Sequence, residues 1–177
     1  MAGKILMIVA PERFRDEELF VPKEYFEGKG IKVEVASTRK GDCKGVLGGV
    51  AESSLTLGEV DVGEYDAVVF VGGGGTPVIR KEERALEIAR ETVDAKRVLA
   101  AICWAPTILA KAGVLKGKKA TVWVGADAEY GKKTSEVLED FGAQYSEEGC
   151  VVDGRIVTAD GPATAKRMAA EIVKLLG

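Results

Sequence analysis

A chain of 177 residues, of which 46% are hydrophobic, is long enough for one well-buried domain and short for two, so we expect a single domain over residues 1–177. Its 25 basic and 28 acidic side chains are interspersed and leave a net charge of −3, which argues against nucleic acid or an anionic membrane as a partner. The longest apolar run, residues 98–110, is too short to span a bilayer and contains Pro106. Because no signal peptide precedes the first strand-like segment, we expect a cytoplasmic protein.

Histidine is absent, which removes the commonest metal ligand and the commonest general base. We therefore expect neither a metal nor a cofactor. The odd number of widely spaced cysteines, Cys43, Cys103 and Cys150, argues against a disulfide framework. Asparagine is also absent and glutamine occurs once, whereas 30% of residues are charged, a composition typical of a thermophilic protein.

Apolar strand-like segments alternate with amphipathic helical segments along the whole chain. In chain order we predict a strand at 4–10, a helix at 16–26, a strand at 31–36, a polar glycine-rich loop at 38–49, short irregular strands at 50–57, a strand at 65–71, a helix at 82–95, a strand at 98–102, a helix at 107–112, a strand at 120–124, a helix at 132–141, a hairpin at 150–157 and a last helix from Gly161-Pro162 to Leu176. This alternation predicts an α/β fold with a mostly parallel sheet and helices on both faces.

The segment Val98-Leu-Ala-Ala-Ile-Cys-Trp-Ala-Pro106 reads as a buried strand, an abrupt turn at Cys103 and the start of a helix. A side chain at such a turn is presented at the open end of the sheet, as in a nucleophile elbow, and the turn favours small residues such as Ala101 and Ala105 on either side. A helix N-terminus would stabilise a thiolate there. A buried, unreactive cysteine at a strand end remains the alternative.

The carboxyl ends of parallel strands form one edge of a sheet, where ligands bind in open α/β folds. The turns after Ala10, Val71 and Ile102 should therefore meet. This brings residues 12–18, the glycines at 72–75 and Cys103 together. No Lys-Ser/Thr follows the glycines, which excludes a P-loop.

These motifs, in this order, resemble the ThiJ/PfpI superfamily, which includes intracellular protease I and the Parkinsonism-associated deglycase. The resemblance rests on the Ala-Ile-Cys elbow, the strand ending in Gly-Gly, the Glu-x-x-x-Pro near the start and the Asp-Gly hairpin before a Gly-Pro helix. It implies a class I glutamine amidotransferase-like fold, which is a flavodoxin-like three-layer sandwich, and a homo-oligomer.

The resemblance also implies roles for individual residues. Cys103 matches the reactive elbow cysteine, and Glu18, four residues before Pro22, matches the carboxylate that usually hydrogen bonds to it. Gly73 and the amide of Trp104 match an oxyanion-type pocket, with Gly74 beside them.

Three positions depart from the family pattern. Trp104 stands where a histidine often follows the cysteine, and Trp123 stands where a second histidine often lies. Indole cannot accept a proton, so both bases are missing. Asp160 replaces an arginine that often precedes the last Gly-Pro, and we expect it to position a loop or a dimer contact.

These features favour cysteine-dependent chemistry on a reactive carbonyl, of the glyoxalase or deglycase kind, with Glu18 moving the proton. Peptide hydrolysis is harder, because the leaving amine must be protonated. The expected partner is a small carbonyl compound or, on the second interpretation, a peptide. A non-catalytic redox sensor that uses the same cysteine and an inactive binding module are further alternatives.

Overall fold

The structure, a computed structural model, describes residues 3–177. A seven-stranded sheet with the order β13-β14-β8-β7-β1-β3-β6 runs through the molecule, and neighbouring strands are parallel except for the β13-β14 hairpin. The strands of this sheet are β1 (Lys4–Ile8), β3 (Lys32–Ser37), β6 (Leu55–Thr56), β7 (Ala67–Phe70), β8 (Val98–Ile102), β13 (Cys150–Asp153) and β14 (Ile156–Ala159). The predicted mostly parallel sheet is confirmed.

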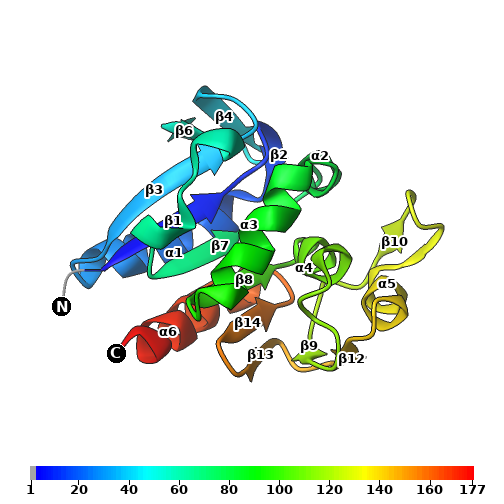
Figure 1. Ribbon diagram of the computed structural model, residues 1–177. Helices are drawn as coiled ribbons and strands as arrows, with labels where there is room; N and C mark the ends of the chain where they lie inside the picture. The colour runs from blue at the N-terminus through cyan, green and yellow to red at the C-terminus, as the bar shows by residue number, and fades with distance from the viewer. Residues whose placement is uncertain (1–2) are drawn as a thin grey trace.

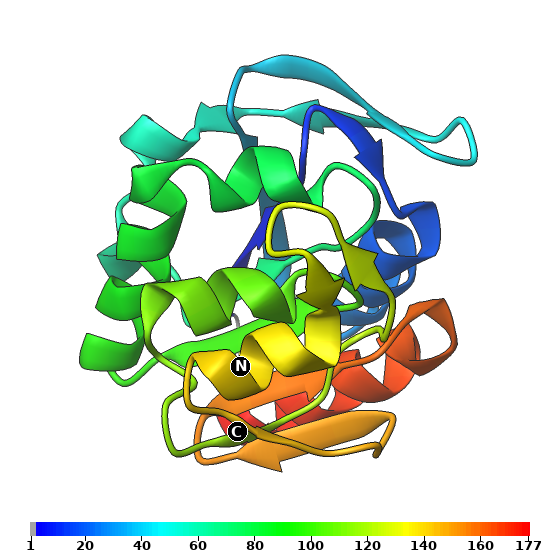
Figure 2. The ribbon, with the colours of Figure 1, turned by 90° about the vertical axis from the view of Figure 1, so that its right-hand side faces the viewer.

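Helices cover both faces of this sheet (Figure 1). The helices are α1 (Asp16–Gly28), α2 (Thr76–Arg80), α3 (Glu83–Asp94), α4 (Pro106–Ala112), α5 (Thr134–Asp140) and α6 (Ala165–Leu176), with short 3-10 turns at η1 (Leu57–Glu59), η2 (Val62–Glu64) and η3 (Pro162–Thr164). α1 and α6 pack together on one face, whereas α3 and α4 lie on the other (Figure 2). The result is the predicted three-layer α/β/α arrangement.

Strand β1 shows why the centre of the sheet is apolar on both sides. Successive side chains of a strand point to opposite faces. Ile5 and Met7 enter the core under α1 and α6, while Leu6 and Ile8 enter the core under α3 and α4. A strand between two helical layers must therefore be a continuous apolar run.

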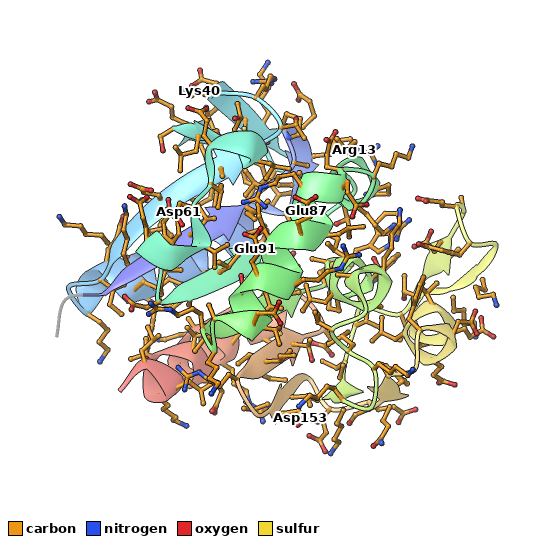
Figure 3. All side chains as sticks on the ribbon, in the orientation of Figure 1. Arg13, Lys40, Asp61, Glu87, Glu91 and Asp153 are labelled. Carbon is orange, nitrogen blue, oxygen red and sulfur yellow. The ribbon has the colours of Figure 1, made fainter. Side chains whose placement is uncertain are left out.

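Charged side chains cover the outer surface (Figure 3). On α3, Arg84 contacts both Glu87 and Glu91, which lie on the helix face turned away from the sheet. Such ion-pair networks fit the charge-rich composition. Within the described residues, no helix combines the length and the apolar character needed to cross a membrane.

Two predicted segments differ from the structure. Of the strand predicted at 120–124, only Ala120 is in a strand, β9 (Lys119–Ala120), which pairs with β12 (Gln144–Tyr145) outside the central sheet. The reason is that β7 and β14 already occupy both sides of β8. The segment instead passes over the carboxyl end of β8, where the Trp123 amide donates to the Cys103 carbonyl at 2.8 Å.

The loop predicted at 38–49 contains β4 (Gly41–Gly45), which forms a hairpin with β5 (Val50–Ser53) and pairs with β2 (Glu12–Phe14). Long-range pairing with β2 overrides the polar, glycine-rich composition. Cys43, which falls in this segment, is consequently fully buried. Cys43, Cys103 and Cys150 are all free thiols.

Helix boundaries shift where local pairing competes. α1 begins at Asp16, as predicted, and continues through Pro22 to Gly28. The helix predicted from residue 132 begins at Thr134, because β11 (Lys132–Lys133) pairs with β10 (Ala126–Asp127) to form a small hairpin. This hairpin extends beside α5 at the carboxyl edge of the sheet (Figure 1).

Lys96 follows α3 with a φ of 58° and an exposed side chain, at a position where glycine is favoured. We predict that Lys96→Gly raises the free energy of unfolding by about 0.5–1 kcal/mol, because glycine avoids the left-handed strain of an L-residue at a smaller cost in chain entropy. Lys96→Ala, which keeps the strain, should give no increase. Denaturant titration of the three proteins measures this, and equal gains from both variants would contradict it.

Candidate active site

Cys103 lies at a strained turn between β8 and α4, with a φ of 64° that non-glycine residues rarely adopt. Its amide donates to the Ala159 carbonyl at 2.8 Å, which ties the turn to β14. Ala101 and Ala105 on either side are completely buried, leaving no room for larger side chains. The predicted elbow geometry is therefore present.

The glycine run after β7 brings the second loop against this turn. A Cβ on Gly72 would lie 2.5 Å from the Ile102 carbonyl oxygen and 2.7 Å from both Cys103 Cβ and Glu18 Oε1. No side chain fits at that point. Gly73 has a φ of 113° and packs equally closely on the Arg13–Arg15 backbone. The three turns expected to meet at the carboxyl edge do so.

Glu18 projects from the first turn of α1 into this junction and is completely buried. Neither carboxyl oxygen has a partner of ordinary hydrogen-bond geometry. Burial raises the pKa of Glu18 to about 8, although the thiol of Cys103 and the amide of Gly72 face the carboxyl and partly offset this shift. Glu18 therefore carries a proton at neutral pH.

Burial also raises the pKa of Cys103, and the neighbouring carboxyl of Glu18 raises it further. The backbone amides of Trp104 and Gly73 act in the opposite direction and do not outweigh these effects. The amides at this helix N-terminus favour a thiolate, as expected, but burial and Glu18 oppose them and raise the pKa of Cys103 overall. Thiol and carboxyl both hold protons near neutral pH.

A cavity of about 260 Å³ opens above the thiol. Its lining residues are Arg15, Val46, Gly73, Gly74, Cys103, Trp104 and Trp123. The two indole rings lie with their centroids 5.6 Å apart and inclined by 50°, and Trp123 is 38% exposed. The two tryptophans therefore line the cavity and leave it open.

Behind Trp104 lies a buried ionic cluster that sequence reasoning missed. Arg80 of α2 and Asp127 of β10 form a two-pronged ion pair, with N–O distances of 2.6 and 3.1 Å. The indole of Trp104 donates to the same Asp127 carboxylate at 2.9 Å. The partners are 47 residues apart in segments without a motif, so no sequence signal connected them.

The remaining sequence candidates lie outside this cavity. Asp160 accepts a hydrogen bond from Thr164 Oγ1 at 3.0 Å, so it holds the loop before α6. Among residues 3–177, no group of three or more His, Cys, Asp or Glu side chains is arranged to hold a metal ion.

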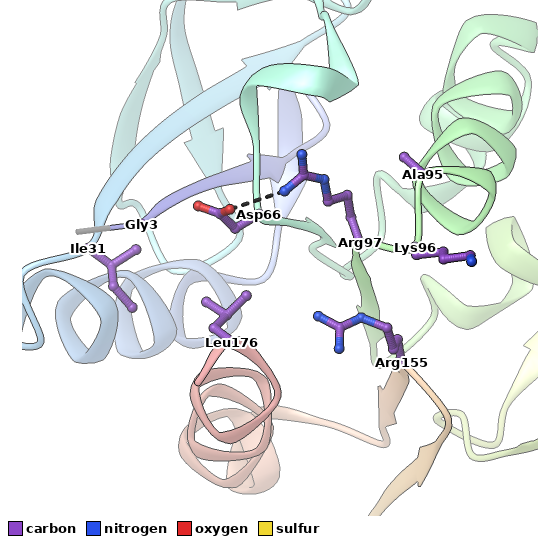
Figure 4. A pocket seen from close by; sticks show the side chains of 8 residues that line it. All are labelled: Gly3, Ile31, Asp66, Ala95, Lys96, Arg97, Arg155 and Leu176. Atoms are coloured by element: carbon purple, nitrogen blue, oxygen red, sulfur yellow. Dashed lines mark hydrogen bonds and ion pairs between the residues drawn. The ribbon is translucent and has the colours of Figure 1, made fainter. Parts of the chain in front are cut away.

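A second cavity, of about 310 Å³, lies at the opposite edge of the sheet (Figure 4). Its lining residues Asp66, Arg97 and Arg155 directly precede β7, β8 and β14. Asp66 and Arg97 form an ion pair across it at 3.3 Å. This cavity is far from Cys103, which follows the other end of β8.

Residues 3–175 match the DJ-1/PfpI family. The chain belongs to the DJ-1/PfpI family. It is 41% identical over 175 residues to an uncharacterised protein of Methanocaldococcus jannaschii, covering 98% of this chain and 82% of the relative. It is 36% identical over 173 residues to a protein of Pyrococcus furiosus named Deglycase PfpI, covering 98% and 99%.

Among solved structures, a ThiJ/PfpI domain protein from Brachyspira murdochii superposes with a TM-score of 0.89 at 35% identity, covering 98% of this chain and 95% of that one. The predicted membership and the flavodoxin-like fold are thereby confirmed.

The raised pKa of Glu18 makes stability depend on pH. A carboxyl with an ordinary pKa of 4.5 when unfolded and about 8 when folded binds more protons in the folded state, so its contribution to stability falls as pH rises from 4.5 to 8. We predict that Glu18→Gln flattens this decline and is the more stable protein above pH 8. Thermal unfolding between pH 5 and 9 measures it, and parallel curves for the two proteins would contradict it.

Proposed function

We propose that this protein is a cysteine-dependent enzyme acting on reactive carbonyl compounds, of the glyoxalase or deglycase kind. The observation that carries the proposal is the pairing of the Cys103 thiol with the protonated, buried carboxyl of Glu18 beneath an open cavity. The similarity to Deglycase PfpI over nearly the full length of both chains supports it.

For an α-oxoaldehyde the chemistry begins with a bond between Sγ and the aldehyde carbon. The thiol proton passes to one carboxyl oxygen of Glu18 as the other oxygen protonates the carbonyl oxygen, which gives a hemithioacetal and leaves Glu18 protonated. The amides of Gly73 and Trp104, which face the sulfur, stabilise negative charge that develops during addition.

Turnover needs no outside oxidant. Transfer of the hydrogen on the aldehyde carbon, as a proton, to the neighbouring carbonyl carbon oxidises the first carbon and reduces the second, giving a thioester of a 2-hydroxy acid. Water then cleaves the thioester, releases the acid and restores the thiol. Glu18 is the one buried carboxyl beside the sulfur in the described chain, and the role of proton carrier falls to it.

Two other interpretations of the sequence receive less support from this geometry. A peptidase must protonate an amine leaving group, and the histidine that serves this purpose is replaced by Trp104, which holds Asp127 instead. A redox sensor needs an exposed thiol of lowered pKa, whereas burial raises the pKa of Cys103.

We predict that the protein consumes methylglyoxal without added cofactor and forms lactate. Cys103→Ser should lower kcat/KM by about a thousandfold or more, and Glu18→Gln by about a hundredfold, because the nucleophile and the proton carrier act in the same step. Cys43→Ser is the matched control at a thiol that does not line the cavity. Wild-type turnover that survives in Cys103→Ser would contradict the proposal.

The pairing of the two groups makes a further prediction. The neighbouring carboxyl of Glu18 raises the pKa of Cys103, most strongly once it is ionised, so Glu18→Gln should lower that pKa and speed alkylation of Cys103 by iodoacetamide at pH 8.5. The same variant loses carbonyl turnover. Peptide mass mapping of the labelled cysteine measures the rate, and slower labelling in the variant would show that Glu18 does not face the sulfur.

A further inference from the structure

Trp104, the residue directly after the nucleophile, is held at two points by one hydrogen-bonded ring. Its indole nitrogen donates to Asp127 Oδ2 at 2.9 Å, and its carbonyl oxygen accepts from Thr107 Oγ1 at 2.8 Å. Arg80 Nη1 closes the ring by donating to Asp127 Oδ2 at 2.6 Å and to Thr107 Oγ1 at 2.9 Å. These hydrogen bonds therefore fix both the plane of the Trp104 indole and the position of the Trp104 backbone.

The anchor of this ring is rigid because it is buried. The side chains of Arg80 and Asp127 are 0% exposed. Glu129 accepts from Arg80 Nη2 at 2.8 Å on the outer side, and the ring of Tyr130 lies 4.8 Å from the guanidinium. A buried ion pair is weak evidence for stability, but it holds a hydrogen-bonded partner in one place.

The Trp104 indole, which this ion pair holds, forms a wall of the cavity above Cys103. The Trp104 indole packs beside the Trp123 indole, with the two ring centroids 5.6 Å apart. Val46 extends the apolar lining. The other residues that line the cavity are Arg15, Gly73 and Gly74, so the indoles provide most of its apolar side-chain surface. A flat substituent on a bound carbonyl compound would therefore meet indole surface, with which aromatic groups stack favourably.

We propose that Asp127, fixed by Arg80, is a positioning residue that holds the Trp104 indole as an aromatic wall, and that this wall selects α-oxoaldehydes with a flat aromatic substituent over methylglyoxal. The substrate class rests on the proposed function. The placement of the indole does not, because it can be observed on the Cys103 thiol alone.

The first experiment compares kcat/KM for phenylglyoxal and methylglyoxal. The wild-type protein should prefer phenylglyoxal by about tenfold, the gain expected from an aromatic contact. Asp127→Asn should abolish the preference by raising KM for phenylglyoxal while kcat for methylglyoxal changes little. Glu129→Gln is the matched control, since it removes a carboxylate from Arg80 and leaves the hydrogen bond to the indole.

The second experiment needs no turnover. Cys103 is alkylated with 2-bromoacetophenone, which carries an aromatic ring, or with iodoacetamide, which does not. The rate with 2-bromoacetophenone divided by the rate with iodoacetamide, measured at the Cys103 peptide, should fall in Asp127→Asn and stay unchanged in Glu129→Gln. In a Trp123→Phe background, acrylamide quenching of Trp104 fluorescence should rise in Asp127→Asn. If neither carbonyl compound is turned over but the aryl selectivity of alkylation depends on Asp127, the proposed function is wrong, whereas the positioning of the Trp104 indole by Asp127 is supported.

Two results would overturn the inference. One is a wild-type protein without aryl selectivity in alkylation. The other is an equal loss of aryl selectivity in Asp127→Asn and Glu129→Gln, which would mean that the cluster acts only on the stability of the β10-β11 hairpin. Should Asp127→Asn fail to fold, Trp104→Phe leaves the Arg80–Asp127 ion pair in place and removes the indole N–H together with part of the aromatic surface. It must then lower the aryl-to-small ratio, and an unchanged ratio would overturn the inference.

Discussion

The contact between the buried Glu18 carboxyl and the Cys103 thiol is the interaction on which the site depends. A carboxyl removed from water without hydrogen-bonded partners holds its proton, and a thiol beside it holds its own. The protein meets this condition by bringing three turns so close that only glycine is possible at position 72. Close approach, protonation and potential reactivity thus follow from one packing arrangement.

This arrangement changes how a site without histidine can work. In the proposed mechanism, proton transfer falls to the single carboxyl of Glu18, whose raised pKa lies near neutral pH, the range that suits general acid–base catalysis. The positions where the family often has histidine carry indoles. The indole of Trp104 makes its hydrogen bond to Asp127, so the proposal assigns substrate contact and proton transfer to different residues.

Several features of the fold and the site were predictable because they depend on local sequence. The apolar runs at β1, β7 and β8 indicate strands buried on both faces, and small residues around Cys103 indicate a sharp turn. Other features were not predictable. The segment at 120–124 has a strand-like pattern but finds both sides of β8 occupied, and the polar segment at 41–45 becomes a strand because β2 offers a partner.

The amino-acid sequence by itself determined the α/β architecture, the elbow at Cys103 and the nearness of Glu18 to it, because periodicity, glycines and strand ends act over a few residues or through general rules of sheet topology. Tertiary structure alone decided the protonation of the pair and the placing of Trp104. Desolvation depends on everything that covers a group, and the Arg80–Asp127 pair joins segments that only folding brings together.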